Sequence, residues 1–370
     1  MLHRLTGALA GLALVSAAGL AIPPSAHAAK AAAKSSVHAV ALDPKPIAGF
    51  GAAPKATGPG APVQLIKVHG KSLEGNAEGE SADRDVVVVL PPSYAKSPNR
   101  RYPVIYFMHG FGITADWFAA FMHVPETMLA ASKKGEEFIV VLPDTDTKFG
   151  GSMYSSSPTT GDFESFIAND LTAFIDGHYR TLAKRSSRGL VGHSMGGYGT
   201  WKVAMDHPEK WGAIYAMSAC CMSARKETVE SAKKMSELTV EQAAAGNFGV
   251  KAGVASLVAW SPNPKNPPFF ADQPYKDGAV DQSVLDRWAA NSPIVMVSTH
   301  VPQLKSFVAV ASDGGDKDGL TKDAGVMHEE LDRFGVVNSF EVYDGNHVNR
   351  IAERFDSKVL PYFKAHLALK

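Results

Sequence analysis

The chain has 370 residues, enough for one large domain or two small ones, and 45% of its residues are hydrophobic while 20% are charged. This composition is that of an ordinary globular protein with a substantial core. The 37 basic and 37 acidic residues give a formal net charge of zero, which argues against a nucleic-acid partner and against electrostatic attraction of a strongly acidic substrate.

The N-terminal segment has the pattern of a secretory signal peptide. Arg4 provides a positive start, residues 5–22 are apolar, and Ala-His-Ala at residues 26–28 is a cleavage motif. A retained membrane anchor is the alternative, because the apolar run is near the lower limit for a span. We predict a signal peptide over residues 1–28, a secreted or periplasmic mature protein, and no stable membrane insertion after cleavage.

Residues 29–62 are rich in Ala, Gly, Pro and Lys without apolar periodicity, which predicts a flexible leader before a single domain over residues 63–370. Apolar runs then alternate with helical spacing. The predicted strands are residues 63–69, 85–90, 102–108, 138–142, 188–191, 213–217, 306–311 and 339–343. The predicted helices are residues 124–134, 163–179, 198–205, 323–334 and 348–367.

This alternation predicts an α/β fold with a mostly parallel central sheet and helices on both faces. Residues 224–293 interrupt the alternation with helical pieces and a Pro-rich stretch, and we expect them to form a helical, cap-like insertion over one end of the sheet. Ligands of such sheets bind at the carboxyl ends of the strands, so polar side chains that directly follow strands are the candidates for chemistry.

The most informative stretch is Gly-His-Ser-Met-Gly at residues 192–196, between a predicted strand and a predicted helix. A strand that turns at once into a helix forces Ser194 into a strained backbone conformation with its hydroxyl exposed, and only glycines leave room for the turn. The helix N-terminus then directs free N–H groups at an oxyanion. A non-catalytic glycine-rich turn is the alternative.

A serine hydroxyl becomes a nucleophile when a base removes its proton and an acid orients that base. His347, in a loop after the last predicted strand, is the best candidate base. Asp318, which also follows a strand, is the candidate acid, with Asp316 in reserve. Asp344 is too close to His347 in sequence to reach behind its ring.

The oxyanion is expected to bind the backbone N–H groups of Met195 and Phe111, the latter in a loop that His109 supports. Trp117 and Tyr154 are candidates to line the acyl or alcohol pocket, with packing as the alternative. We predict no cofactor and no metal site: an H-E-x-x-H motif is absent. The adjacent Cys220 and Cys221 form either a vicinal disulfide or a buried pair of small side chains.

Several motifs together resemble the putative-esterase family of α/β-hydrolases, which includes esterase D, feruloyl esterases and mycolyltransferases. They lie at residues 106–112, 140–144, 179–181, 192–198 and 207–209. The resemblance implies the α/β-hydrolase fold, Ser194 as nucleophile and His347 as base. The family's acid follows a Gly-x-x-Asp pattern, which Asp318 matches.

The expected function is that of an exported serine hydrolase that cleaves carboxylic esters through an acyl-enzyme on Ser194. The substrate would be a small-molecule or polysaccharide-linked ester. The alternative is an acyltransferase, which would pass the acyl group to a sugar or another alcohol.

Overall fold

The computed structural model describes residues 40–370, which form one unit with an α/β architecture. The predicted signal peptide and residues 29–39 of the predicted leader lie outside the described residues. Within residues 40–370, none of the helices combines the length and the apolar character needed to cross a bilayer.

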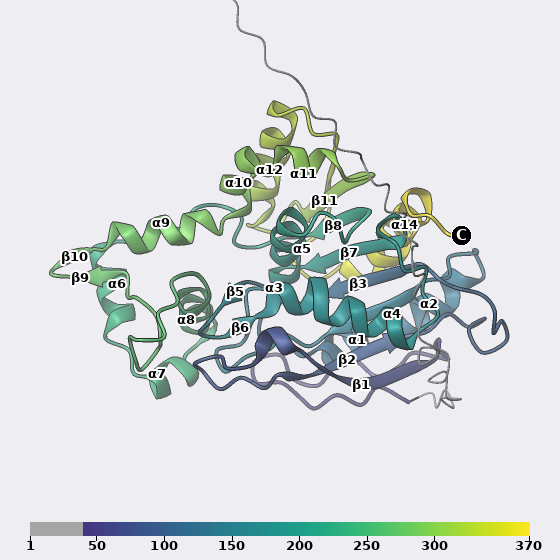
Figure 1. The fold of residues 1–370 in the computed structure, drawn as a ribbon, viewed down its shortest axis with the longest axis horizontal. Helices are drawn as coiled ribbons and strands as arrows, with labels where there is room; N and C mark the ends of the chain where they lie inside the picture. Colours follow the sequence, from purple (N-terminus) through teal and green to yellow (C-terminus); the bar gives the residue numbers. More distant parts are fainter. Residues whose placement is uncertain (1–39) are drawn as a thin grey trace, which may run out of the picture. The chain divides into compact units, whose positions relative to one another are not determined.

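An eight-stranded sheet forms the centre of this unit, in the order β1-β2-β4-β3-β7-β8-β11-β12 (Figure 1). The strands are β1 (Val63–His69), β2 (Asp83–Val89), β3 (Val104–Met108), β4 (Ile139–Pro143), β7 (Arg188–His193), β8 (Ala213–Met217), β11 (Ala309–Gly315) and β12 (Ser339–Tyr343). β1, β2 and β4 pair antiparallel, whereas all neighbours from β4 to β12 pair parallel. The predicted fold class, a mostly parallel sheet within an α/β-hydrolase fold, is confirmed.

A hydrophobic core lies on each face of the sheet, where helices cover it. Successive side chains of the central strands point alternately into the two cores. Along β3, Val104, Tyr106 and Met108 enter one hydrophobic core while Ile105 and Phe107 enter the other. The first core also takes side chains from α3 (Phe163–Ser165), η2 (Phe166–Leu171, a π-type turn), α4 (Thr172–His178), α5 (Met195–Asp206) and α12 (Thr321–Arg333). The second takes side chains from α1 (Ala115–Phe121), α2 (Val124–Ser132), α13 (Ile351–Arg354), η5 (Phe355–Val359, a π-type turn) and α14 (Leu360–His366).

The predicted insertion contains short helices and one hairpin, and in Figure 1 its green segments extend to one side of the sheet. Its elements are α6 (Val229–Ser236), α7 (Val240–Ala244), α8 (Phe248–Trp260), β9 (Tyr275–Lys276), β10 (Ala279–Val280) and α9 (Gln282–Ala290), followed by α10 (Pro293–Met296), η4 (Val297–Thr299) and α11 (Val301–Lys305). α8 is attached to the loop that carries β5 (Ser156–Ser157) and β6 (Gly161–Asp162), where the Ser157 hydroxyl donates to the carbonyl of Val258 at 2.8 Å. Short helical turns at η1 (Lys71–Leu73) and η3 (Arg185–Ser187) complete the described elements.

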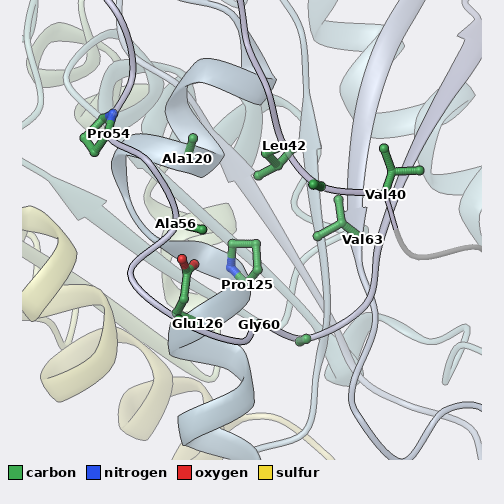
Figure 2. A pocket seen from close by; sticks show the side chains of 12 residues that line it. Val40, Leu42, Pro54, Ala56, Gly60, Val63, Ala120, Pro125 and Glu126 are labelled. Carbon is green, nitrogen blue, oxygen red and sulfur yellow. The ribbon is translucent and has the colours of Figure 1, made fainter.

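Residues 40–62, which the sequence analysis expected to be flexible, pack against α1 and α2. The N–H of Ala61 donates to the carbonyl of Pro125 at 2.7 Å, and Phe50 lies edge-on to Trp117 with ring centroids 5.7 Å apart. Leu42 and Ile47 of this segment also pack, partly buried, against the second hydrophobic core. Between the segment and α2 a cavity of about 280 Å³ remains, and Figure 2 shows Leu42, Pro125 and Glu126 among the residues that line it.

Candidate active site

The connection between β7 and α5 has the geometry that the glycine spacing predicts. Ser194 adopts φ 59° and ψ −115°, a region that side-chain-bearing residues rarely occupy. A Cβ atom on Gly192 would lie 2.1 Å from the carbonyl oxygen of Gly196, and one on Gly196 would lie 2.1 Å from that of Met108. Both positions therefore require glycine, and the strained residue between them is the serine.

Three side chains that are far apart in sequence form one hydrogen-bonded chain. The Oγ of Ser194 lies 2.9 Å from Nε2 of His347, and Nδ1 of the same ring lies 2.8 Å from Oδ2 of Asp318. Each residue follows the carboxyl end of a parallel strand, β7, β12 or β11, which is why the topology brings them to one edge of the sheet. The structure thus brings together the three residues that the sequence analysis named.

The protonation of this chain follows from Asp318, whose side chain is largely buried. Burial alone would raise the pKa of its carboxyl, but hydrogen bonds from His347 and from the N–H of Leu320 outweigh burial and hold the pKa below its ordinary value. An ionised carboxylate only accepts hydrogen bonds, so Nδ1 of His347 carries the proton and Nε2 accepts from the serine hydroxyl. This tautomer is the one that a general base requires.

The other two aspartates that the sequence analysis considered have different partners. Oδ1 of Asp316 accepts from the N–H of Gly345 at 2.9 Å. Asp344 forms an exposed ion pair with Lys317. Neither carboxyl hydrogen bonds to the His347 ring, so the geometry favours Asp318 over the reserve candidate.

The backbone N–H groups of Met195, the first residue of α5, and of Phe111 donate no hydrogen bond to any other group within residues 40–370. The loop that carries Phe111 is held by the N–H of Gly112, which donates to the carbonyl of Gly150 at 2.6 Å. The Phe111 ring also packs against Gly150 and Gly151, where a Cβ atom would come within 3.0 Å of it. These two N–H groups are the donors that the sequence analysis named for an oxyanion.

His109 and Tyr154 are buried supports of this loop. His109 bridges the Gly110 carbonyl at Nδ1, 2.8 Å away, and the N–H of Thr145 at Nε2, 2.9 Å away. Burial lowers the pKa of His109 below its ordinary value, so the ring is neutral and can both donate and accept. The hydroxyl of Tyr154 donates to the His109 carbonyl at 2.9 Å. Tyr154 is fully buried as a support, which is the packing role that the sequence analysis named as the alternative to lining a substrate pocket.

Trp117 also packs within the scaffold. Its ring is stacked on Phe121, with centroids 5.1 Å apart, and its Nε1–H donates to the carbonyl of Gly51 at 3.1 Å. Only 5% of the residue is exposed. Of the two roles considered for Trp117, these contacts favour packing, because residues 40–62 cover the face of α1 that carries this side chain.

His193, which directly precedes the nucleophile, is a site residue to which the sequence analysis gave no role. Its Nε2–H donates to the main-chain carbonyl of His347 at 2.8 Å. Burial, assisted by the neighbouring His347, lowers the pKa of His193 to about 3. The available signal was the place of His193 next to the nucleophile, from which it can hold the loop of the base.

Within residues 40–370, no group of three or more His, Cys, Asp and Glu side chains is arranged to hold a metal ion. The hydrogen-bonded chain at Ser194 consists of protein groups suited to nucleophilic chemistry.

Comparison with known proteins now assigns the family. Residues 80–350 match the family described as "Putative esterase". The chain belongs to this family. The match includes Ser194, His347 and Asp318, and it extends over the insertion and over every strand of the sheet except β1.

Two curated relatives match a short region of this putative-esterase chain, and about a third of the aligned residues are identical. Esterase Rv1288 of Mycobacterium tuberculosis is 35% identical over 124 residues, which are 32% of this chain and 25% of the relative. An endo-1,4-beta-xylanase/feruloyl esterase of Xylanibacter ruminicola is 32% identical over 133 residues, 34% of this chain and 18% of the relative. The matched region spans a quarter or less of these relatives.

Solved structures share the fold at lower sequence identity. A ferulic acid esterase superposes with a TM-score of 0.59 at 22% identity, over 82% of this chain and 97% of that one. An S-formylglutathione hydrolase from Agrobacterium tumefaciens superposes with a TM-score of 0.56 at 17% identity, over 84% and 98%. These likenesses extend the α/β-hydrolase assignment over most of the chain.

Proposed function

We propose that this protein hydrolyses carboxylic esters through an acyl-enzyme on Ser194. The observation that carries the proposal is the continuous chain from the Ser194 hydroxyl through His347 to Asp318, at 2.9 and 2.8 Å. Membership of the putative-esterase family supports the same reaction class. The unpartnered N–H groups of Met195 and Phe111 would supply hydrogen bonds to the oxyanion of the tetrahedral intermediate.

The proposed reaction begins when the Ser194 oxygen attacks the ester carbonyl carbon and His347 takes the hydroxyl proton at Nε2. The carbonyl oxygen becomes an oxyanion that accepts hydrogen bonds from the N–H groups of Met195 and Phe111. Asp318 stabilises the imidazolium through Nδ1. When the intermediate collapses, His347 returns the proton to the leaving alcohol, and the acyl group stays on Ser194. Water then repeats the sequence and releases the acid.

We propose that the insertion at residues 224–293 is a cap that forms part of the acyl pocket. Phe248, at the start of α8, lies edge-on to Phe111 with centroids 5.2 Å apart, so the insertion reaches the residue whose N–H is a proposed oxyanion donor. Phe269 packs on Phe149 with centroids 5.9 Å apart. These aromatic contacts suit an acyl group with an apolar body. The relatives named as feruloyl and ferulic acid esterases make aromatic acids the first to test.

We also propose that the protein is exported, on the strength of the signal-peptide pattern over residues 1–28. Cleavage after Ala28 would release a mature chain in which residues 40–62 still cover α1. The substrates within reach would then be ester-linked groups on small molecules or polysaccharides outside the cytoplasm.

The experiment that tests the function is hydrolysis of p-nitrophenyl acyl esters and methyl hydroxycinnamates. We expect Ser194→Ala to lower kcat at least 10³-fold, and His347→Ala and Asp318→Asn to cause losses of the same order. Asp316→Asn is the matched control, because this carboxyl hydrogen bonds to Gly345 and not to the His347 ring. Near-normal turnover in Ser194→Ala would overturn the proposal.

An excess of a sugar or alcohol acceptor distinguishes hydrolysis from acyl transfer. We expect the yield of free acid to stay unchanged, because water resolves the acyl-enzyme. A transferred ester that replaces the free acid would instead identify an acyltransferase with the same nucleophile.

A further inference from the structure

The loop after β8 contains the only two cysteines of the chain, Cys220 and Cys221. Both are free thiols and both are half-buried. Their sulfur atoms lie 2.8 Å apart, closer than two thiols in ordinary contact, so the side chains point the same way. A small reagent that reaches one sulfur therefore finds the other beside it.

This pair is attached directly to the proposed nucleophile. The N–H of Cys220 donates to the main-chain carbonyl of Ser194 at 3.1 Å, and the N–H of Ser194 donates to the carbonyl of Met217 at the end of β8. The loop after β8 is itself constrained, because Ser218 and Cys221 adopt φ values of 42° and 60°. A change in the conformation of this loop must therefore reach Ser194 in the connection between β7 and α5.

We propose that Cys220 and Cys221 are an oxidation site that closes reversibly to a vicinal disulfide and thereby slows turnover at Ser194. The disulfide chemistry stands on the geometry of the pair, whereas its effect on turnover rests on the proposed function. Nothing in the proposed ester hydrolysis uses either sulfur, so the pair is free for this second role.

A low-molecular-weight disulfide is the oxidant, and thiol–disulfide exchange balances the reaction. The thiolate of one cysteine attacks a sulfur of the oxidant, which forms a mixed disulfide and expels the first thiol of the reagent. The second cysteine then attacks the protein sulfur of that mixed disulfide and expels the second. Two cysteine sulfurs are oxidised, the oxidant disulfide is reduced to two thiols, and the two cysteine protons end on those thiols.

Two properties set the conditions under which the disulfide forms and opens. The adjacent Cys221 thiol and burial raise the pKa of Cys220 well above its ordinary value, so its thiol keeps its proton near neutral pH, and exchange is faster at alkaline pH. Neighbouring Cα atoms are about 3.8 Å apart, closer than in most disulfides, so the closed ring is strained and is reduced readily. The site should therefore open again with a mild dithiol reductant.

Closure of the disulfide restricts the side-chain and backbone angles of both cysteines. The hydrogen bond from the Cys220 N–H to the Ser194 carbonyl must then change its geometry, which should slow the reaction. A displacement of about 1 Å in a catalytic group can cost on the order of 100-fold in rate. We expect kcat to fall about tenfold when the ring closes, with recovery on reduction.

Treatment of the folded protein with dithiodipyridine tests the chemistry, because each exchange step releases one coloured thiopyridone. We expect wild type to release two equivalents, to form no disulfide bond between chains, and to lose the mass of two hydrogen atoms. Cys220→Ser and Cys221→Ser should each release one equivalent and keep the pyridyl adduct. A stable adduct on the wild type, or disulfide-linked dimers, would overturn the proposal.

The coupling to turnover is measured as kcat before oxidation, after oxidation and after reduction, with the double variant Cys220→Ser/Cys221→Ser as control. We expect a reversible fall in wild type and no response in the double variant. Equal kcat in the open and closed forms would refute the coupling. If no ester is hydrolysed at all, the thiopyridone stoichiometry still decides whether the disulfide forms, so failure of the proposed function is recognised separately.

Discussion

His193 stands directly before the proposed nucleophile, and its Nε2–H is hydrogen-bonded to the main-chain carbonyl of His347. The ring lies parallel to that of Phe118, at 15°, and only 4% of the residue is exposed. Because the pKa of His193 is lowered to about 3, the ring stays neutral wherever the base can function. A neutral imidazole here donates one fixed hydrogen bond and adds no charge beside His347.

Replacing His193 should therefore impair the placement of the base without removing it. We expect His193→Leu to lower kcat about tenfold, equivalent to ~1.4 kcal/mol, because the His347 carbonyl loses its donor, while KM changes little. His193→Gln keeps an N–H donor and should recover part of the loss. Steady-state kinetics of both variants check this, and equal losses in the two would point to a packing role for the ring alone.

The residues of the proposed triad could be named from sequence because each directly follows a predicted strand, and parallel strands end at one edge. The roles of Trp117 and Tyr154 could not be derived in this way. The side-chain environment of Trp117 depends on residues 40–62, which lack periodicity, and that of Tyr154 depends on the closeness of Gly199, where a Cβ atom would lie 2.5 Å from its ring. Contacts of this kind are set by tertiary packing and leave no local pattern.

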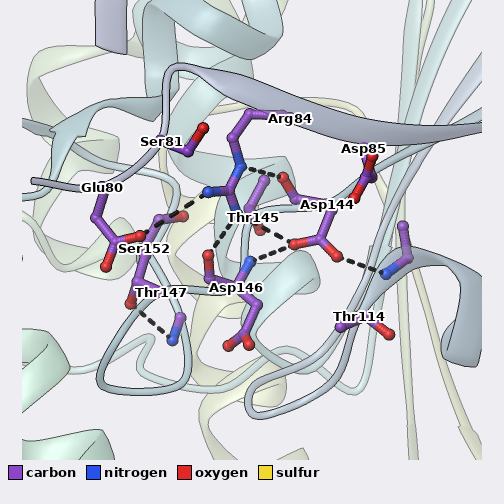
Figure 3. A network of polar contacts seen from close by, with 12 residues as sticks. Glu80, Ser81, Arg84, Asp85, Thr114, Asp144, Thr145, Asp146, Thr147 and Ser152 are labelled. Carbon is purple, nitrogen blue, oxygen red and sulfur yellow. Dashed lines mark hydrogen bonds and ion pairs between the residues drawn. The ribbon is translucent and has the colours of Figure 1, made fainter. Parts of the chain in front are cut away.

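At the scale of elements, the loop over residues 144–152 links β2 to the proposed oxyanion donors. Arg84, only 8% exposed, donates to Oδ1 of Asp144 at 3.1 Å and to the carbonyl of Asp146 (Figure 3). Asp144 in turn accepts from the N–H groups of Asp146 and Ala115. The same loop supplies the Thr145 N–H that holds His109. A buried guanidinium thus fixes the backbone that positions Phe111.

We expect Arg84→Met to destabilise the fold by about 3 kcal/mol, because it leaves the largely buried Asp144 carboxylate without its cation. The retained folded enzyme should also show a lower kcat, since the oxyanion loop loses its anchor. Chemical denaturation and kinetics measure the two effects. Arg333→Met is the matched control: its ion pair with Glu330 is exposed, and its loss should cost less than 1 kcal/mol. A similar stability for both variants would contradict the role of the network.

The bounds of a strand are predicted best where its apolar pattern and its hydrogen bonds to neighbouring strands end at the same residue. Residues 63–69, 213–217 and 339–343 have the same bounds in the sequence prediction and the structure. β11 was predicted over residues 306–311 but spans Ala309–Gly315. Its polar and glycine end, residues 312–315, continues to pair with β12, and a pairing partner cannot be seen in the hydropathy of one strand.

At the scale of the whole described unit, the loop between β5 and β6 joins two other parts of the chain by hydrogen bonds. One part is the segment before β2, and the other is the insertion. The N–H of Glu78 donates to the carbonyl of Thr159 at 2.9 Å, while the Thr159 hydroxyl donates to the carbonyl of Phe270. The carboxyl of Glu78 is enclosed in this junction, and neither oxygen has a hydrogen-bond partner within residues 40–370. An ionised Glu78 is therefore poorly compensated.

This junction should make the stability of the protein depend on pH. Burial, assisted by the charge of Glu80, raises the pKa of Glu78 from 4.5 to about 8. The folded state then holds a proton that the unfolded state releases, so the stabilising contribution is complete below pH 4.5 and is lost as the pH rises towards 8. Glutamine mimics the protonated carboxyl at every pH.

We therefore expect Glu78→Gln to raise Tm by a few degrees at pH 8 and to leave it nearly unchanged at pH 4.5. Thermal unfolding of both proteins across this range measures the difference. Glu237→Gln is the control, because its exposed side chain interacts only weakly with Lys233, 3.7 Å away, and should give parallel curves. Asp146, whose pKa burial raises to about 7, contributes a fall of the same sign in every variant. The difference between the Glu78→Gln and wild-type curves thus isolates Glu78, and a constant difference across the range would show that this carboxyl is already ionised in the folded protein.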